Sequence, residues 1–309
     1  MRILVTGGAG FIGSHIAEAY FRHGAHVAVA DNLSSGKKEN IHPKAEFFKI
    51  DIESPGLENV FKEFKPDIVN HHAAQIDVRR SVADPLFDSR VNIAGTINLL
   101  QNCVKYKTKK IIFASTGGAI YGEQEYFPAD EAHPTKPLSP YGIAKLSAEH
   151  YLYYYKFNYG LNYIALRYSN VYGPRQDPHG EAGVVAIFIQ KLLRNEQPVI
   201  NGSGRQTRDF VYVADIVRAN LLALKTKKDG IFNIGTSIET DINTIFKMLV
   251  KITEAGVKTV HCPVKPGEQK RSVITHKKAK RNLGWKPTVF LEDGLKKTVE
   301  YFKNEYFTK

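Results

Sequence analysis

The chain has 309 residues, of which 43% are hydrophobic, so it can bury one large core or two moderate ones and does not have the composition of a disordered chain. The net charge of +12 is compatible with nucleic-acid binding, because basic proteins neutralise phosphates. The lysines, however, occur in short scattered pairs, without a basic tail or interleaved aromatic residues. We therefore predict a solvated lysine-rich surface and no nucleic-acid partner.

No run of about 18 apolar residues occurs, and the first residues show neither a basic leader nor a cleavage site. These features predict a cytoplasmic protein without a membrane partner. The two cysteines, Cys103 and Cys262, cannot form a disulfide framework, and neither has the spacing of a metal ligand. We expect no metal site.

Short apolar runs alternate with amphipathic segments through the first half of the chain, which indicates repeated strand-helix units. The predicted strands are Arg2–Thr6, His26–Ala30, Glu46–Ile50, Asp67–His71, Lys110–Ala114 and Asn162–Arg167, and helices are expected to start near Phe11, Gly56, Pro85 and Ser139. The pattern predicts an α/β fold with a doubly wound parallel sheet of the Rossmann type, whose ligands bind beyond the carboxyl ends of the strands.

The alternation loosens after Tyr168 into Gly- and Pro-rich loops separated by a few helices. We expect a dinucleotide-binding domain over residues 1–170 and a smaller C-terminal α/β lobe for the substrate over residues 171–309. The apolar run Ile231–Ile234 has the composition to return as a further strand of the main sheet.

A glycine-rich turn follows the first predicted strand, with Gly7, Gly10 and Gly13 in a Gly-x-x-Gly-x-x-Gly pattern that opens an apolar helix. Glycines allow a tight turn there and let a pyrophosphate approach the helix N-terminus. Asp31 lies 18 positions past Gly13, at the end of the second strand, where a carboxylate binds ribose hydroxyls and repels a 2′-phosphate. The pattern predicts NAD rather than NADP.

Two further strand ends support this cofactor site more weakly. Asp51 follows the third predicted strand, and Ala73 and Ala74 follow the fourth. Small or acidic residues are common at such positions, so they carry little weight alone.

The most specific pattern is Ser139-Pro140-Tyr141-Gly142-Ile143-Ala144-Lys145. Ser139 suits a helix N-cap and Pro140 the first helical position, which puts Tyr141 and Lys145 one turn apart on one face. A lysine ammonium and a cationic nicotinamide would both favour a tyrosine phenolate, which is a general base. Thr116, at the end of the fifth strand, would bind the same substrate hydroxyl.

Together these motifs resemble the extended short-chain dehydrogenase/reductase family, and within it the prokaryotic UDP-glucose 4-epimerase branch. The resemblance also rests on three later segments, 166–175, 208–213 and 282–285, and so covers nearly the whole chain. It implies a UDP-sugar substrate and bound NAD. The residues that it implies for the cofactor are Gly7, Gly10, Phe11, Ile12, Asp31, Asn32, Asp51, Ile52, Ala73, Ala74, Gln75, Asn92, Tyr141, Lys145 and Tyr168. The residues that it implies for the substrate are Thr116, Tyr141, Asn170, Arg208, Lys265, Arg271 and Ser272, with Thr116, Tyr141 and Lys145 catalytic.

Relatives that dehydrate or decarboxylate their sugar carry an acid just after the position of Thr116, whereas this chain has Gly117 and Gly118. Without that acid, the simplest fate of a 4-keto sugar is to regain hydride on its other face, so the sequence predicts 4-epimerisation. An epimerase for UDP-N-acetylglucosamine or UDP-glucuronate stays an alternative, as does a non-catalytic NAD-linked binding protein.

Three positions depart from the pattern of these relatives. His72 replaces an apolar residue and is interpreted as a packing variant. Lys265 stands where an arginine often binds the diphosphate, which leaves the role of Arg271 open. Ser272 is small at a position that gates the sugar 2-substituent, which predicts entry of UDP-N-acetylglucosamine.

A tyrosine cluster, Tyr151, Tyr153, Tyr154 and Tyr155, offers more aromatic side chains than one buried helix face can accept. The resemblance implies a homodimer that pairs helices from this region with the Pro85–Tyr106 segment.

Overall fold

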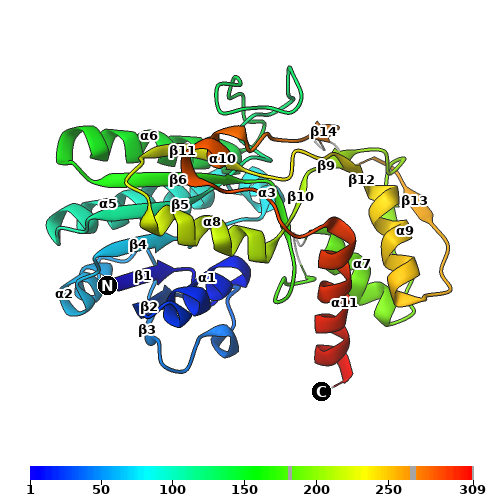
Figure 1. Cartoon of the computed structure of the whole chain (residues 1–309), viewed down its shortest axis with the longest axis horizontal. Coiled ribbons are helices and arrows are strands. Elements are labelled where there is room, and N and C mark those ends of the chain that lie inside the picture. The colour runs from blue at the N-terminus through cyan, green and yellow to red at the C-terminus, as the bar shows by residue number, and fades with distance from the viewer. Residues whose placement is uncertain (180–182, 265–268, 308–309) are drawn as a thin grey trace.

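A seven-stranded parallel sheet forms the centre of the computed structural model, which describes residues 1–179, 183–264 and 269–307. The strand order is β11-β6-β5-β4-β1-β2-β3 (Figure 1). The strands are β1 (Arg2–Thr6), β2 (His26–Asp31), β3 (Glu46–Lys49), β4 (Ile68–His71), β5 (Lys110–Thr116), β6 (Asn162–Tyr168) and β11 (Gly230–Ile234). Because the order reverses between β1 and β4, the crevice for a ligand lies at the carboxyl ends of these two strands.

Helices cover both faces of the sheet, which explains why its central strands are continuous apolar runs. One face carries α1 (Phe11–Arg22), α8 (Val213–Lys225) and α10 (Lys277–Leu283), and the other carries α2 (Leu57–Phe64), α5 (Gly95–Lys105) and α6 (Pro140–Tyr159). In α2 the buried residues are Leu57, Val60, Phe61 and Phe64. This spacing is that of an amphipathic helix with one apolar stripe.

Short helical segments connect β4 to α5 and lie beside α6. They are α3 (Val78–Ala83), α4 (Pro85–Ser89) and a π-helical turn at Arg90–Ala94, and a 3₁₀ turn, Lys38–Asn40, lies between β2 and β3. The carboxylates of Asp77 and Asp84 cap α3 and α4 by accepting amide hydrogen bonds.

The C-terminal lobe has its own core. Its helices are α7 (Val184–Leu193), α9 (Ile242–Thr253) and α11 (Leu291–Phe307), which stand at one end of the sheet in Figure 1. Its small sheets pair β7 (Asn170–Tyr172) with β10 (Phe210–Tyr212), β9 (Thr207–Arg208) with both β12 (Thr240–Asp241) and β14 (Arg271–Ser272), and β8 (Val199–Asn201) with β13 (Val260–Cys262).

The predicted fold class is confirmed, and the six predicted strands all form with ends within two residues of those expected. The run Ile231–Ile234 returns to the main sheet as expected, because it lies in β11, which pairs with β6 beyond the expected cut at residue 170. The segments that form α8, β11 and α10 all pack on the main sheet although they follow that cut. We propose that the two domains are defined by which core their segments pack on, so the chain passes between the main sheet and the lobe several times.

Candidate active site

The glycine-rich turn brings β1, α1 and the end of β4 into close contact. Gly7 has a φ of +69°, and a Cβ there would lie 2.5 Å from the amide nitrogen of Ala73, so no other residue fits. Gly10 is the N-cap of α1 and supplies no capping side chain. The N-terminal amides of α1, including those of Phe11 and Ile12, are therefore suited to an anion such as a pyrophosphate.

Asp31 is the last residue of β2, and its carboxylate orders the loops around it. It accepts hydrogen bonds from the amides of Ala9, at 2.9 Å, and Leu33, at 2.8 Å. Two oxygens offer about four lone-pair sites, so this carboxylate retains acceptors for ribose hydroxyls. Asn32 donates to Asp51 across 2.8 Å, which joins the ends of β2 and β3 at the predicted adenosine position.

Two hydrogen bonds join the side chain of Asn92 to the main chain of Gln75 beside β4. The Asn92 amide accepts from the Gln75 main-chain nitrogen at 3.0 Å and donates to its carbonyl at 2.9 Å. Both side chains are buried. Asn92 therefore holds the loop that follows Ala73 and Ala74, beyond the carboxyl end of β4, where the cofactor is expected. Ile52, also buried, packs at Gly95.

Tyr168, which the resemblance implies for the cofactor site, has its side chain inside the fold. Its side chain is buried on the face covered by α1 and α8, where the hydroxyl accepts from Asn220 at 2.8 Å and lies 3.3 Å from His72 Nε2. The rings of His72 and Tyr168 also stack. A contact between Tyr168 and a cofactor would have to come from its main chain, because its side chain is enclosed. His72 packs as expected.

The three predicted catalytic residues meet where α6 packs on the end of β5. Ser139 caps α6 by accepting from the Gly142 amide at 3.1 Å, and Pro140 occupies the first turn, as predicted. Lys145 is buried and donates to the Ala114 carbonyl at 3.0 Å. Its Nζ lies 5.9 Å from the centre of the Tyr141 ring.

Thr116 and Tyr141, in contrast to Lys145, are only partly buried. The Thr116 hydroxyl oxygen accepts from the amides of Gly118 and Ala119, each at 3.2 Å. Because these bonds use its lone pairs, the hydroxyl proton is directed to a further acceptor, such as a substrate oxygen.

The electrostatics of this site are dominated by burial. Burial lowers the pKa of Lys145 to about 8, against the raising effects of Asp88 and Glu149. Burial, followed by the charge of Asp88, raises the pKa of Tyr141 above its ordinary value. Burial and Asp88 therefore disfavour the phenolate, whereas a positive charge nearby favours it.

The space beyond Thr116 is open at Gly118 and closed at Gly117. A Cβ on Gly118 would stand 3.9 Å from both Thr116 Oγ1 and Asn170 Oδ1, whereas one on Gly117 would meet Ile274 Cδ1 at 2.5 Å. Thr116 and Asn170 thus border one space, and no acidic side chain of the described residues lies within 4 Å of the position of a Gly118 Cβ.

The predicted phosphate-binding residues lie on the lobe. Arg208 ends β9, and its direct neighbour in the parallel pairing with β14 is Ser272, which is buried. Arg271 lies on the outer side, where Glu239 accepts from it at 2.9 and 3.0 Å and its guanidinium stacks 3.6 Å from the Phe127 ring centre. The expectation for Lys265 falls outside the described residues.

Sequence reasoning missed several buried charged residues around the site. Asp88 lies on α4, Glu149 on α6 itself, Arg167 on β6, and Asp209 follows Arg208. The sequence around them gave no signal of their burial. A single sequence does not show whether such a residue is buried.

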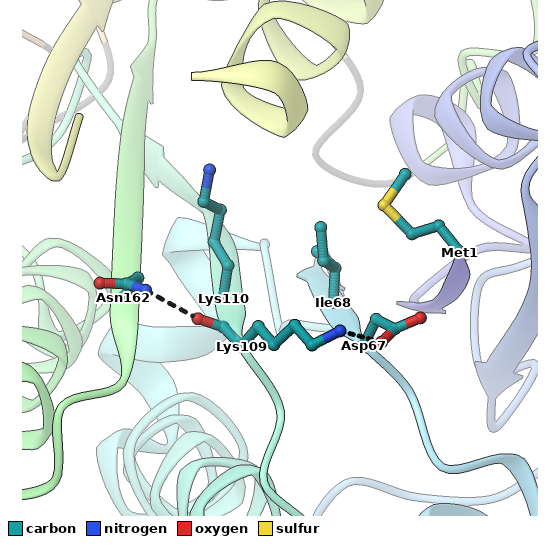
Figure 2. A pocket seen from close by; sticks show the side chains of 6 residues that line it. All are labelled: Met1, Asp67, Ile68, Lys109, Lys110 and Asn162. Carbon is teal, nitrogen blue, oxygen red and sulfur yellow. Dashed lines mark hydrogen bonds and ion pairs between the residues drawn. The ribbon is translucent and has the colours of Figure 1, made fainter. Parts of the chain in front are cut away.

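The cavity drawn in Figure 2, of about 450 Å³, lies at the opposite end of the sheet. Its lining residues are Met1, Asp67, Ile68, Lys109, Lys110 and Asn162, which stand at the amino ends of the strands. Lys109 pairs with Asp67 at 2.8 Å, and Lys110 donates to the carbonyls of Ala223 and Thr226. Both ammonium groups are occupied, so this cavity is not a candidate for the site.

Within the described ranges, no cluster of three or more His, Cys, Asp or Glu side chains is arranged to hold a metal ion. The same ranges contain no helix that is long and apolar enough to span a membrane.

The fold and the site define a dinucleotide-dependent enzyme of the extended short-chain dehydrogenase/reductase class. The family model described as the NAD dependent epimerase/dehydratase family matches residues 3–235, and the chain belongs to this family.

The chain is similar to three proteins over nearly its whole length. The structure of UDP-glucose 4-epimerase from Thermotoga maritima with UDP-glucose is 51% identical, has a TM-score of 0.98, and covers 99% of this chain and 100% of its own. The Thermus thermophilus UDP-glucose 4-epimerase complex with NAD is 44% identical, with a TM-score of 0.94 and coverage of 98% and 99%. The UDP-glucose 4-epimerase of Mycolicibacterium smegmatis is 42% identical over 99% of both chains.

Proposed function

We propose that this chain interconverts UDP-glucose and UDP-galactose as an NAD-dependent 4-epimerase. The observation that carries the proposal is the open space beside Thr116 and Asn170, into which Gly118 projects no acid. Tyr141 and Lys145 on α6 lie next to the strand that bears Thr116. The site thus has groups to move one proton at a sugar hydroxyl, and the two residues after Thr116 supply no acid for elimination from a neighbouring carbon.

The residues present fit NAD. Gly7 and Gly13 allow the tight turn, because a Cβ on either would lie 2.5 Å or less from backbone atoms of Ala73 or Gly7. The N-terminus of α1 lacks a side-chain cap, and Asp31 retains acceptor sites. We assign the dinucleotide to these groups, with Asn32, Asp51, Ile52, Ala73, Ala74, Gln75 and Asn92 shaping the site. When bound, NAD supplies reversible hydride acceptance at the sugar C4.

The chain's own residues handle the proton and the diphosphate. Tyr141 removes the proton of the 4-hydroxyl, Thr116 donates a hydrogen bond to the same oxygen, and Lys145 provides the nearby positive charge. Asn170 and Arg208 hold the diphosphate, which leaves the 4-keto sugar free to present its opposite face. Because the site regains its starting state, it needs no added oxidant in each turnover.

The decisive test is NMR analysis of products after incubation of the purified protein with UDP-galactose, without added NAD. UDP-glucose should accumulate with the wild type and not with Tyr141→Phe. Tyr153→Phe, on the same helix but 61% exposed, is the matched control and should retain full activity. No conversion by the wild type, even with added NAD, would reject the proposal and direct the search to other nucleotide sugars.

UDP-N-acetylglucosamine is a second candidate substrate because Ser272 is small and lies directly beside Arg208. The same NMR experiment with this sugar tests it. Absence of any turnover would exclude a role for Ser272 in admitting the larger 2-substituent.

A homodimer in the cytoplasm completes the proposal. The outer side of α6 exposes Tyr153, Tyr154 and Phe157, which are 61%, 47% and 77% exposed, and Leu86 on neighbouring α4 is 72% exposed. Apolar surface of this kind is typical of an interface. Tyr155 instead packs in the core. Sedimentation at micromolar concentration should show a dimer, and a monomer would contradict this part.

A further inference from the structure

A carboxylate that no motif predicted is buried beside the catalytic helix. Asp88 on α4 is 0% exposed. Its Oδ1 accepts hydrogen bonds from Gln75 Nε2 and Asn92 Nδ2, each at 2.9 Å. Its Oδ2 is also buried but has no hydrogen-bond partner. Such an oxygen is costly in a protein interior unless a nearby positive charge stabilises it.

Lys145 supplies a buried positive charge on α6, the helix against which α4 packs, and it interacts electrostatically with Asp88. Burial raises the pKa of Asp88, whereas its two hydrogen bonds and the charge of Lys145 lower it. Conversely, Asp88 is the larger of the two influences that oppose the effect of burial on the pKa of Lys145. Each group therefore favours the charged form of the other.

The second carboxylate near Lys145 is already neutralised. Both oxygens of Glu149 accept from Arg167, at 2.9 and 2.6 Å, and one of them also accepts from the Ser115 hydroxyl at 2.6 Å. This bidentate pair is buried, and it satisfies the charge of Arg167. Among the described carboxylates that influence Lys145, Asp88 is the one with an unbonded oxygen.

The remaining titratable groups around α6 do not compete for this role. His71, the last residue of β4, and His72, which follows it, are uncharged at neutral pH, because burial and then the charge of Lys145 lower the pKa of each. Arg79, Arg80, Arg90 and Lys105, on the helical segments packed against α6, are exposed to solvent. Lys110 on β5 is half-buried but lies at the amino end of that strand, where it donates to the carbonyls of Ala223 and Thr226.

We propose that Asp88 is a positioning residue for the reaction, as the buried counter-ion of the Lys145 ammonium. Through Gln75 and Asn92 the same carboxylate also fixes the loop that follows β4, where the cofactor is proposed to bind. One side chain therefore both holds this loop and stabilises the charge of the catalytic lysine. The role in the reaction rests on the proposed epimerase function, whereas the charge pairing is a property of the chain itself.

Asp88→Asn tests the proposal because asparagine keeps the shape and one acceptor oxygen but removes the charge. Loss of a negative charge lowers the pKa of both Lys145 and Tyr141. Both limbs of the pH profile of kcat should therefore move to lower pH, by about 1 unit. Asp84→Asn is the matched control, because it makes the same change one turn away at an exposed N-cap, and it should leave the profile unchanged.

A second readout does not depend on activity. The ε-carbon NMR shift of Lys145 in the purified holoprotein, identified by its loss in Lys145→Met, reports the ionisation of the ammonium. Its midpoint should fall by about 1 unit in Asp88→Asn and not in Asp84→Asn. If the wild type proves inactive on every nucleotide sugar, this titration still tests the pairing, so the two proposals fail separately.

The proposal would be overturned if Asp88→Asn changed neither the pH profile of kcat nor the midpoint of the Lys145 titration. Asp88 would then be a structural residue, even if the variant had a lower Tm or kcat. If Asp88→Asn does not fold, Asp88→Ser removes the charge with a smaller side chain and is judged by the same two measurements.

Discussion

The Lys145 ammonium lies 5.9 Å from the centre of the Tyr141 ring while it donates to the Ala114 carbonyl at 3.0 Å. The lysine is therefore anchored to β5, and its charge acts on Tyr141 through space. A positive charge at this distance favours ionisation of the tyrosine, against the effect of burial.

The first prediction is a loss of activity above pH 8. Burial lowers the pKa of Lys145 to about 8, so the cation is present below this pH and is lost above it. The rate constant kcat, measured from pH 6.5 to about 9.5, should decline on the alkaline side with a midpoint near the pKa of the group that is lost. Lys145→Arg, whose charge persists, should be slower but lack this decline. A flat wild-type profile through that range would contradict the assignment.

The second prediction compares the two glycines that follow Thr116. In Gly117→Ala the new methyl would lie 2.5 Å from Ile274 Cδ1, whereas in Gly118→Ala its nearest atoms are at 3.9 Å. We expect Gly117→Ala to lower the free energy of unfolding by about 1–3 kcal/mol, and Gly118→Ala to leave it nearly unchanged. Urea unfolding of both variants measures this, and equal stabilities would show that Ile274 moves aside without cost.

The sequence predicted the Rossmann-type sheet and the positions of Thr116, Tyr141 and Lys145 because each depends on local patterns. Apolar runs give the strands, and Ser139 with Pro140 fixes where α6 begins. The side-chain environment of Tyr168 was not predictable in this way. Its place beside Asn220 depends on α8, which is distant in sequence.

The same limit explains why the counter-charges of the site were missed. Asp88 and Glu149 read as ordinary surface acids in one sequence, and only the packing of α4 and α6 on the sheet shows that both are buried. The sequence also did not show the partner of Arg271, since Glu239 is 32 positions away, directly before β12.

The third prediction separates the two arginines of the lobe. Arg208 neighbours Ser272 across the strand pairing, whereas Arg271 is held by Glu239 and Phe127. Loss of charge-assisted hydrogen bonds to a diphosphate costs about 1.5–3 kcal/mol, so Arg208→Ala should raise KM for UDP-galactose roughly 10- to 100-fold. Arg271→Ala should raise it less than about threefold. Steady-state kinetics of the two variants test this prediction. A larger increase in KM for Arg271→Ala than for Arg208→Ala would assign the diphosphate contact to Arg271.

The last prediction concerns how Asp209, which is next to Arg208, contributes to the stability of the fold. Asp209 is buried and accepts hydrogen bonds from the amide and hydroxyl of Thr236, at 2.8 and 2.6 Å, and from the Ser237 amide at 3.1 Å. It also accepts from the Ile274 amide at 3.4 Å. The carboxylate thus joins the end of β11 to the segment after Ser272, next to Arg208.

Burial raises the pKa of Asp209 from 3.8 to about 6, although its hydrogen bonds lower it. Between these values the folded chain keeps a proton that the unfolded chain has lost. The contribution of this group to stability is therefore full below pH 3.8 and is lost as the pH rises through 6. A shift of about 2 units corresponds to about 3 kcal/mol.

Asp209→Asn should remove this pH dependence, so the unfolding free energy of the variant relative to wild type should rise by about 3 kcal/mol between pH 4 and pH 7. Asp241→Asn provides a contrast of opposite sign. Burial alone would raise the pKa of Asp241, but hydrogen bonds from the side chain and amide of Thr244 lower it, so its contribution is present at neutral pH and is lost on acidification. Urea unfolding at a series of pH values measures both. Parallel curves for wild type and Asp209→Asn would mean that Asp209 ionises as readily in the folded chain as in the unfolded one.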